Sequence, residues 1–242
     1  MKTIPLWIFT ISIQILLTAC SINESTEKYD ADLFEDEYYV LKTNMLNPEN
    51  GENHYDAIGK MQGDILEVYF DGSHNHETIE EIYDEINRLI YDFGSIELNG
   101  PELKPDLLER ITAISDAPEA SLDKIISDSH LSEGAKTSLS NFIASLLLLQ
   151  DEDYTEIYYF IVLYEASVID SVQFNSEDKR VILTTSALVR HSASYKKRRK
   201  DKDWETSVGN IAVTVEGALN GSLMAVHMAL VAGISTNTIL SY

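Results

Sequence analysis

The sequence predicts an all-α protein, built as an irregular multi-helix bundle behind a flexible acidic N-terminal tether. Apolar residues recur at helical spacing over long stretches of the chain. Five prolines and eleven glycines in 242 residues interrupt the chain too rarely for a many-stranded sandwich. Internal repeats and long heptad patterns are absent from the sequence, so neither a solenoid nor a coiled coil is expected.

The first half of the chain carries four helix patterns. The clearest begins at Glu77, where an apolar stripe lies opposite a charged one, acidic residues fill the first turns and Gly94 follows the last turn. Pro105 suits the first turn of the third pattern. A short strand over residues 65–70 is the alternative to the end of the first helix. The expected helices cover residues 53–70, 77–93, 105–114 and 119–129.

The second half of the chain is more apolar. Leu146 to Leu149 end a helix that is apolar all round, which favours a place at the centre of the bundle. The region after Trp204 suits one helix or two. Any strands are expected to be short and confined to Tyr38–Leu41 and Ser95–Leu98. The expected helices cover residues 132–149, 154–172, 176–195 and 204–234.

The first twenty residues have the pattern of a cleaved export signal. Lys2 supplies a positive start, and the apolar stretch from Ile4 to Leu17 is too short for a comfortable membrane span. It ends in Leu17-Thr18-Ala19-Cys20, which resembles the lipobox of bacterial lipoproteins. The resemblance implies removal of residues 1–19 as a signal peptide, a thioether-linked diacylglycerol on Cys20, and usually a further acyl chain such as palmitate on its amine.

The lipobox also implies a place for the protein. Cys20 is the only cysteine, so a disulfide within the chain is excluded. The resemblance implies a membrane-anchored protein of the cell envelope, and Ser21 implies the outer membrane if the source is Gram-negative. Residues 20–36 are rich in acidic and small polar side chains and form the expected lipidated tether. Residues 37–242 form the expected helical domain.

The formal net charge of −22 restricts the partners of the protein. Nucleic acid and anionic lipid headgroups repel so acidic a chain, and no nucleic-acid partner is expected. The expected partner is a membrane, reached through the N-terminal lipid, with a protein partner as a further option. The sequence leaves the oligomeric state open.

One turn carries histidines that could bind a metal. His74 and His76 precede Glu77, and two imidazoles at this spacing share a metal when they lie on a strand. Here they lie in a turn before a helix, where residues two apart diverge, and Ser73 or Asn75 can instead cap that helix. His74 and His76 are therefore weak metal candidates. We expect no catalytic residue and no cofactor, because the common nucleophile, phosphate-loop and dinucleotide motifs are missing from the sequence.

A short basic cluster reverses the sign of the charge after the helix expected over 176–195. It could bind an anionic partner such as a phosphate headgroup, at about 1 kcal/mol per residue near an anionic surface. The alternative is a solvated hinge, in which the cations complement the helix dipole and face an acidic body. The cluster consists of Lys196, Lys197, Arg198, Arg199, Lys200 and Lys202.

Small residues recur at every fourth position of the C-terminal region. On one continuous helix they would form a smooth stripe, which lets two helix backbones approach closely, as in membrane helix pairs. Asn220 and His227 interrupt the apolar run, and its longest unbroken part, Met228–Ile234, is too short to span a bilayer. Burial at the centre of a bundle is the favoured interpretation, and membrane insertion or self-association is the alternative. The stripe consists of Gly217, Gly221, Ala225, Ala229 and Gly233.

A second resemblance concerns the helical part. Tyr55-Asp56-Ala57-Ile58-Gly59, followed by helices and a Gly/Ala-rich tail after Trp204, is similar to uncharacterised lipoproteins of Bacteroidota. Gln62-Gly63 stands where those proteins often have His-Asn. This resemblance implies no activity.

The sequence therefore favours a non-enzymatic, lipid-anchored envelope protein that binds, scaffolds or protects. One alternative is an envelope metal-dependent hydrolase that uses His74, His76 and Glu77. The other is a membrane-active or self-associating protein that uses the C-terminal stripe.

Overall fold

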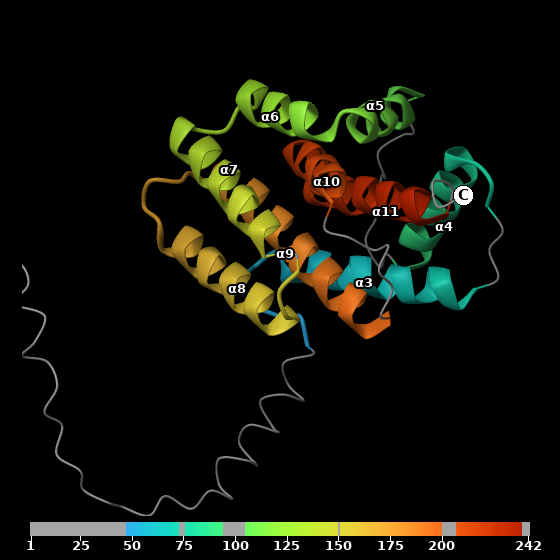
Figure 1. Ribbon diagram of the computed structural model, residues 1–242, viewed down its shortest axis with the longest axis horizontal. Coiled ribbons are helices and arrows are strands. Elements are labelled where there is room, and N and C mark those ends of the chain that lie inside the picture. Colours follow the sequence, from blue (N-terminus) through green and yellow to red (C-terminus); the bar gives the residue numbers. More distant parts are fainter. Residues whose placement is uncertain (1–46, 73–75, 94–104, 150, 200–206, 239–242) are drawn as a thin grey trace, which may run out of the picture. The chain divides into compact units, whose positions relative to one another are not determined.

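The computed structural model describes residues 47–72, 76–93, 105–149, 151–199 and 207–238. These residues form nine α-helices and no strand, which confirms the all-α prediction (Figure 1). Tyr38–Leu41 and Ser95–Leu98, the two places where short strands are predicted, lie outside the described residues. The helices are α3 (Asp56–Asp71), α4 (Ile79–Phe93), α5 (Pro105–Asp116), α6 (Pro118–Asp128), α7 (Glu133–Leu148), α8 (Tyr154–Asp170), α9 (Ser176–Arg199), α10 (Val208–Asn220) and α11 (Ser222–Thr238).

Each predicted helix is present, with changes at the ends. Helix α3 continues to Asp71, so the alternative of a strand over residues 65–70 is wrong. Helix α9 runs to Arg199, about one turn beyond its predicted end, and the C-terminal region forms two helices. Ser132 and Ser207 cap α7 and α10, because each side-chain oxygen accepts a hydrogen bond from the backbone N–H three residues on, at 3.3 and 3.2 Å.

Helix α4 begins with a capping box. Thr78 Oγ1 accepts a hydrogen bond from the Glu81 N–H at 3.2 Å. One carboxylate oxygen of Glu81 accepts in return from the N–H groups of Glu77 and Thr78, at 2.8 and 3.2 Å. Thr78 therefore caps the helix, and Glu77 precedes it. Ser73 and Asn75, the predicted caps, lie outside the described residues.

Helices α10 and α11 form the centre of the bundle. Helix α11 packs against α3, α4, α9 and α10, while α10 also packs against α5, α6 and α9 (Figure 1). Every residue from Ala225 to Ser235 is buried. The most apolar part of the chain thus lies inside a shell of more polar helices, as the hydrophobic effect requires.

Gly221 ends α10 and separates it from α11, so the small residues do not lie on one continuous helix. Its φ of 139° lies in the region that favours glycine. Gly217 lets the two helices touch, since a Cβ there would stand 2.6 Å from the Ala225 Cα. Ala229 and Gly233 are buried on α11 as well. The small residues therefore permit close packing within this chain.

Helices α7 and α8 lie side by side at the edge of the bundle (Figure 1). Stacked aromatic rings join them: the Phe142 ring lies parallel to those of Phe160 and Tyr164, at centroid distances of 5.6 and 4.1 Å. The prediction of a central α7 is wrong, because Leu148, one of its four leucines, is 84% exposed. Two almost uncharged helices, α10 and α11, occupy the centre instead.

Candidate functional site

A polar cluster is buried where α3, α8 and α9 meet, and Glu165 is at its centre. Glu165 lies on α8 and is completely buried. Asn53 Nδ2 and Ser186 Oγ donate to its Oε1 at 2.8 and 2.9 Å, and Asn50 Nδ2 donates to its Oε2 at 2.6 Å. Arg190 on α9 adds a charged donor, with Nη2 3.2 Å from Oε1. A carboxylate tolerates complete burial when its charge is paired and its lone pairs are filled in this way.

Asp56, the first residue of α3, extends the cluster. Its Oδ1 accepts hydrogen bonds from Arg190 Nη2 at 2.7 Å and from His191 Nε2 at 3.1 Å. Burial raises the pKa of Asp56, but hydrogen bonds from His191 and Arg190 outweigh burial, so the pKa lies below its ordinary value. From its place on α9, Arg190 thus bridges one carboxylate on α3 and another on α8.

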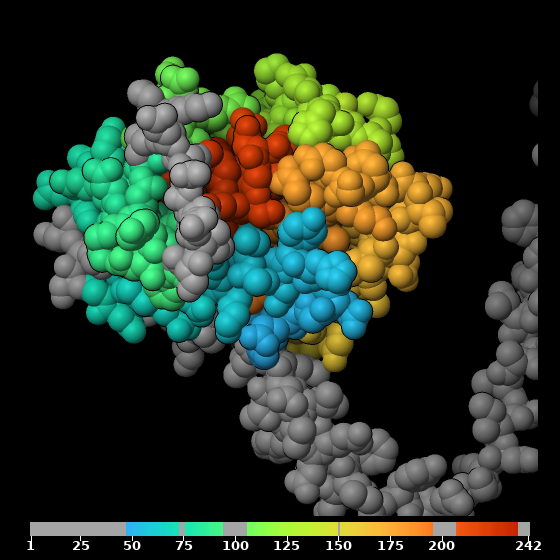
Figure 2. Space-filling view, turned by 180° about the vertical axis from the view of Figure 1, so that it is seen from behind, coloured from blue at the N-terminus to red at the C-terminus, as the bar shows by residue number. Residues whose placement is uncertain are grey.

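The residues before α3, from Asn47 to Tyr55, form the leading segment of the described chain. Asn50 and Asn53 shape it, because each Oδ1 accepts a hydrogen bond from the backbone N–H two residues on, at 3.2 and 2.9 Å. The amide nitrogens of the same side chains donate to Glu165. The two asparagines therefore turn the segment and fasten it to α8. Figure 2 shows the segment in blue beside the gold and orange surface of α8 and α9.

Two backbone contacts complete this attachment. Asn53 Nδ2 also donates to the carbonyl of Leu183 on α9, at 3.0 Å. The hydroxyl of Tyr158 on α8 donates to the carbonyl of Glu49, at 3.1 Å. The leading segment is thus held by both helices.

Gly59 lets α3 approach α9 closely enough to form the cluster. A Cβ at Gly59 would stand 2.7 Å from the Ala187 carbonyl oxygen and would overlap the ring of His191. The motif Tyr55–Gly59 therefore supplies both the Asp56 carboxylate and the space beside it.

The hydrogen bonds of the cluster suit a structural role. Glu165, Ser186 and Arg190 are completely buried. The Glu165 carboxylate and the Leu183 carbonyl share the single hydroxyl proton of Ser186, and neither acceptor is the histidine that would activate a serine nucleophile. The Glu165 carboxylate is already occupied by donors from four side chains, which leaves it poorly placed to take a proton from a substrate.

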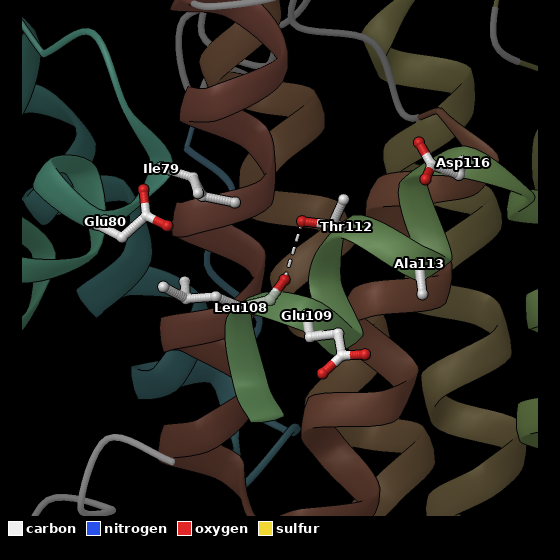
Figure 3. A pocket seen from close by; sticks show the side chains of 7 residues that line it. All are labelled: Ile79, Glu80, Leu108, Glu109, Thr112, Ala113 and Asp116. Carbon is white, nitrogen blue, oxygen red and sulfur yellow. Dashed lines mark hydrogen bonds between the residues drawn. The ribbon is translucent and has the colours of Figure 1, made fainter. Parts of the chain in front are cut away.

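A shallow cleft lies between α4 and α5 (Figure 3). Its volume is about 660 Å³. The only hydroxyl in its lining, on Thr112, donates to the Leu108 carbonyl within α5 at 2.9 Å. Figure 3 shows that the carboxylates of Glu80, Glu109 and Asp116 point in different directions, so they do not converge on one ligand.

Several candidates predicted from the sequence lie outside the described residues. Cys20, His74, Lys200 and Lys202 lie outside them. Residues 196–199 continue α9 as helix, and their side chains also lie outside the description. The basic cluster therefore keeps both of its interpretations, an anionic-partner patch and a hinge.

His76 lies beside Tyr69. Its Nδ1 is 2.8 Å from the Tyr69 hydroxyl, and the two rings stack at a centroid distance of 5.7 Å. Among the described residues, no group of three His, Cys, Asp or Glu side chains could hold a metal ion. In the same part of the chain, no helix combines the length and the apolar character of a membrane span.

Sequence reasoning missed the buried cluster, although a signal for it was present. Glu165 is the only charge between Glu156 and Asp170, and Arg190 and His191 stand in an otherwise uncharged part of α9. An isolated charge inside an apolar helix indicates a buried pair, since a charged side chain is almost never fully buried alone.

No family model, no curated protein and no solved structure matches the chain.

Proposed function

We propose that this protein is a lipid-anchored component of a bacterial cell envelope, and that its helical body is a non-enzymatic binding, scaffolding or protective module. The observation that carries the proposal is Leu17-Thr18-Ala19-Cys20 at the end of an apolar leader. Each acyl methylene buried in the membrane stabilises the anchor by about 0.8 kcal/mol, and several chains together hold a protein durably.

The polar cluster supports the non-enzymatic part of the proposal. Its serine and its central carboxylate bond to each other, and its arginine bridges two carboxylates. A buried network of this kind stabilises a fold and specifies one packing arrangement.

Both alternative functions find less support. The hydrolase would use His74, His76 and Glu77, and the Nδ1 of His76 is already in contact with Tyr69. The membrane-active or self-associating protein would use the C-terminal stripe, and Gly217 and Ala225 already pack against each other.

The anchor is tested on the full precursor, expressed in bacteria that are fed an alkyne analogue of palmitate. The wild-type chain should take up the label and sediment with membranes, whereas Cys20→Ser should do neither. Ser21→Ala is the matched control and should behave as the wild type. In a Gram-negative host, Ser21→Asp should move the protein from the outer to the inner membrane. An unlabelled wild-type chain in the soluble fraction would overturn the proposal.

The non-enzymatic part is tested by incubating the mature chain with peptide, ester, phosphoester and glycoside probes, with and without divalent metal ions. No turnover is expected. Turnover that is lost in His76→Ala would replace the proposal with the metal-dependent hydrolase.

A further inference from the structure

Helix α8 exposes one narrow stripe of side chains. Its exposed positions recur at steps of three or four residues, so they lie along one side of the helix. Leu163 in the middle is 70% exposed and Tyr159 is 46% exposed. An acidic residue stands at each end, and the two ends are about 20 Å apart along the helix. We call this surface the α8 stripe, and it consists of Glu156, Tyr159, Leu163, Ala166, Ser167 and Asp170.

Further apolar and acidic side chains lie at the Glu156 end of α8. Helix α7 ends there at Leu148, which is 84% exposed, and the turn that leads into α8 follows it (Figure 1). An exposed apolar surface with a polar rim is the usual composition of a protein interaction site. The exposed residues of the turn are Asp151, Glu152 and Asp153.

The sequence around α8 lacks positive charge. It contains no lysine or arginine between Lys136 and Lys179. Lys136 forms an ion pair within α7, and Lys179 donates to the Ile169 carbonyl at 2.6 Å, close in sequence to Asp170. The negative charge of the α8 stripe is therefore concentrated at its Glu156 end.

The outer surface of α4 differs, although it also exposes an aromatic ring. Tyr91 is 76% exposed, and Arg88 lies one turn before it. Arg88 Nε donates to Glu85 at 3.0 Å, and its Nη1 donates to Asp92 at 2.9 Å. A surface whose carboxylates already hold a cation attracts a cationic partner less than the Glu156 end of α8 does.

We propose that the α8 stripe binds a cationic amphipathic helix of a protein partner. Apolar side chains of that helix would cover Leu163 and Tyr159, and its lysine or arginine side chains would lie beside Glu156. An amphipathic helix presents apolar residues at the same steps of three and four, and charges at the rim set its direction. The inference rests on the binding role proposed for the helical body and does not depend on the lipid anchor.

Charge favours this occupant over two others. Anionic lipid headgroups would bring negative charge to a stripe that is acidic at both ends. A second copy of the chain would do the same, because two stripes packed face to face bring acidic ends together in either direction. Like charges repel, whereas a cationic helix meets attraction at the Glu156 end.

The test measures the binding of a fluorescein-labelled peptide to the whole mature chain, produced without lipid. The peptide has about 15 leucine and lysine residues, arranged as an amphipathic helix. A leucine–glutamate peptide with the same pattern tests the charge, and a leucine–lysine peptide in scrambled order tests the apolar pattern. Fluorescence anisotropy should show binding of the first peptide and at least about tenfold weaker binding of both control peptides.

A first variant tests the apolar part of the α8 stripe. Leu163→Ser removes the central apolar side chain and leaves the charge unchanged, so it should weaken binding of the leucine–lysine peptide about tenfold. Tyr91→Ser on α4 is the matched control and should leave binding unchanged. Both side chains are mostly exposed, so the core stays intact, as unchanged circular dichroism spectra would confirm.

A second variant tests the acidic end. Glu152→Gln combined with Glu156→Gln should weaken binding about fivefold and make it less sensitive to salt, because two exposed rim charges are lost. Glu80→Gln combined with Asp84→Asn on α4 changes the net charge equally and is the matched control. The control should change the affinity by less than about twofold.

The other outcomes overturn the inference. Equal binding by the wild type and Leu163→Ser would show that net charge alone holds the peptide at another place. Equal binding of the leucine–glutamate peptide would show that charge does not select the partner. A lack of binding, or a dimer that Leu163→Ser dissociates, would show that the α8 stripe meets water or a second copy. The anchor is judged separately, by the labelling of Cys20, so failure here leaves that part of the proposed function in place.

Discussion

Replacing His227 with leucine should make the fold less sensitive to acid. His227 lies on α11, is only 2% exposed, and meets the edge of the Tyr83 ring at a centroid distance of 4.4 Å. Neither of its ring nitrogens has a hydrogen-bond partner among the described residues. Burial lowers its pKa from 6.5 to about 4, because the charged ring would lose its hydration.

The sign and size of the effect follow from the two pKa values. In the unfolded chain the histidine takes up its proton near pH 6.5, whereas in the folded chain it does so only near pH 4. Neutral His227 therefore supports the fold fully above pH 6.5, and this support is lost as the pH falls towards 4. The loss amounts to about 3 kcal/mol in full, and to about 2 kcal/mol at about pH 5.

Urea unfolding of the mature chain at about pH 7 and about pH 5 measures this effect. The free energy of unfolding should fall by about 2 kcal/mol more in the wild type than in His227→Leu. Carboxylates that titrate in both proteins cancel in this comparison. His54→Leu, at an exposed position, is the control and should keep the wild-type pH dependence. An equal fall in the wild type and in His227→Leu would refute the assignment of the effect to His227.

Three further predictions concern the buried cluster and are measured by urea unfolding. Glu165→Ala leaves Arg190 without one of its two carboxylates and should lower the free energy of unfolding by about 3–5 kcal/mol, whereas Ser167→Ala on the exposed side of α8 should change it by less than about 0.5 kcal/mol. Gly59→Ala should destabilise the protein because the added Cβ would clash with α9. Gly63→Ala lies one turn further along α3, where an added Cβ would have no atom of another element within 4 Å, and it should stabilise the protein by about 0.4–1 kcal/mol. Asp56→Asn should lower stability at neutral pH, and its difference from the wild type should shrink as the pH falls through the depressed pKa of Asp56. Equal changes in the free energy of unfolding for Glu165→Ala and Ser167→Ala, or for Gly59→Ala and Gly63→Ala, would contradict these predictions. A pH-independent effect of Asp56→Asn would do so as well.

The helices could be predicted from the sequence because their pattern is local. The apolar stripe of α4 and the capping serines of α7 and α10 lie within a few residues of the elements that they define. The position of a helix in the bundle is not local. Four consecutive leucines predicted a central α7, but Leu148 points to solvent because α10 and α11 have more apolar surface to bury.

The buried cluster could not be assembled from the sequence for the same reason. The isolated charges of Glu165 and Arg190 were visible, but their partners were not. Asn53 precedes Glu165 by 112 residues, and Asp56 precedes Arg190 by 134. No spacing rule links positions so far apart, and an acidic chain offers many carboxylates as candidate partners. The lipobox, in contrast, is a motif of four consecutive residues and can be recognised from the sequence alone. Lipidation of Cys20 stays a prediction.

These long separations also affect how the protein folds. The leading segment and α3 leave the ribosome before α8 and α9, because the residues that hold them, from Glu165 to His191, follow more than 100 residues later. Closing so large a loop has a high entropic cost before any contact compensates for it, which slows folding. Until α8 and α9 have been synthesised, Asn50, Asn53 and Asp56 lack the side chains that they bond in the folded protein. A nascent chain that stops short of α9 should therefore remain unfolded and sensitive to protease.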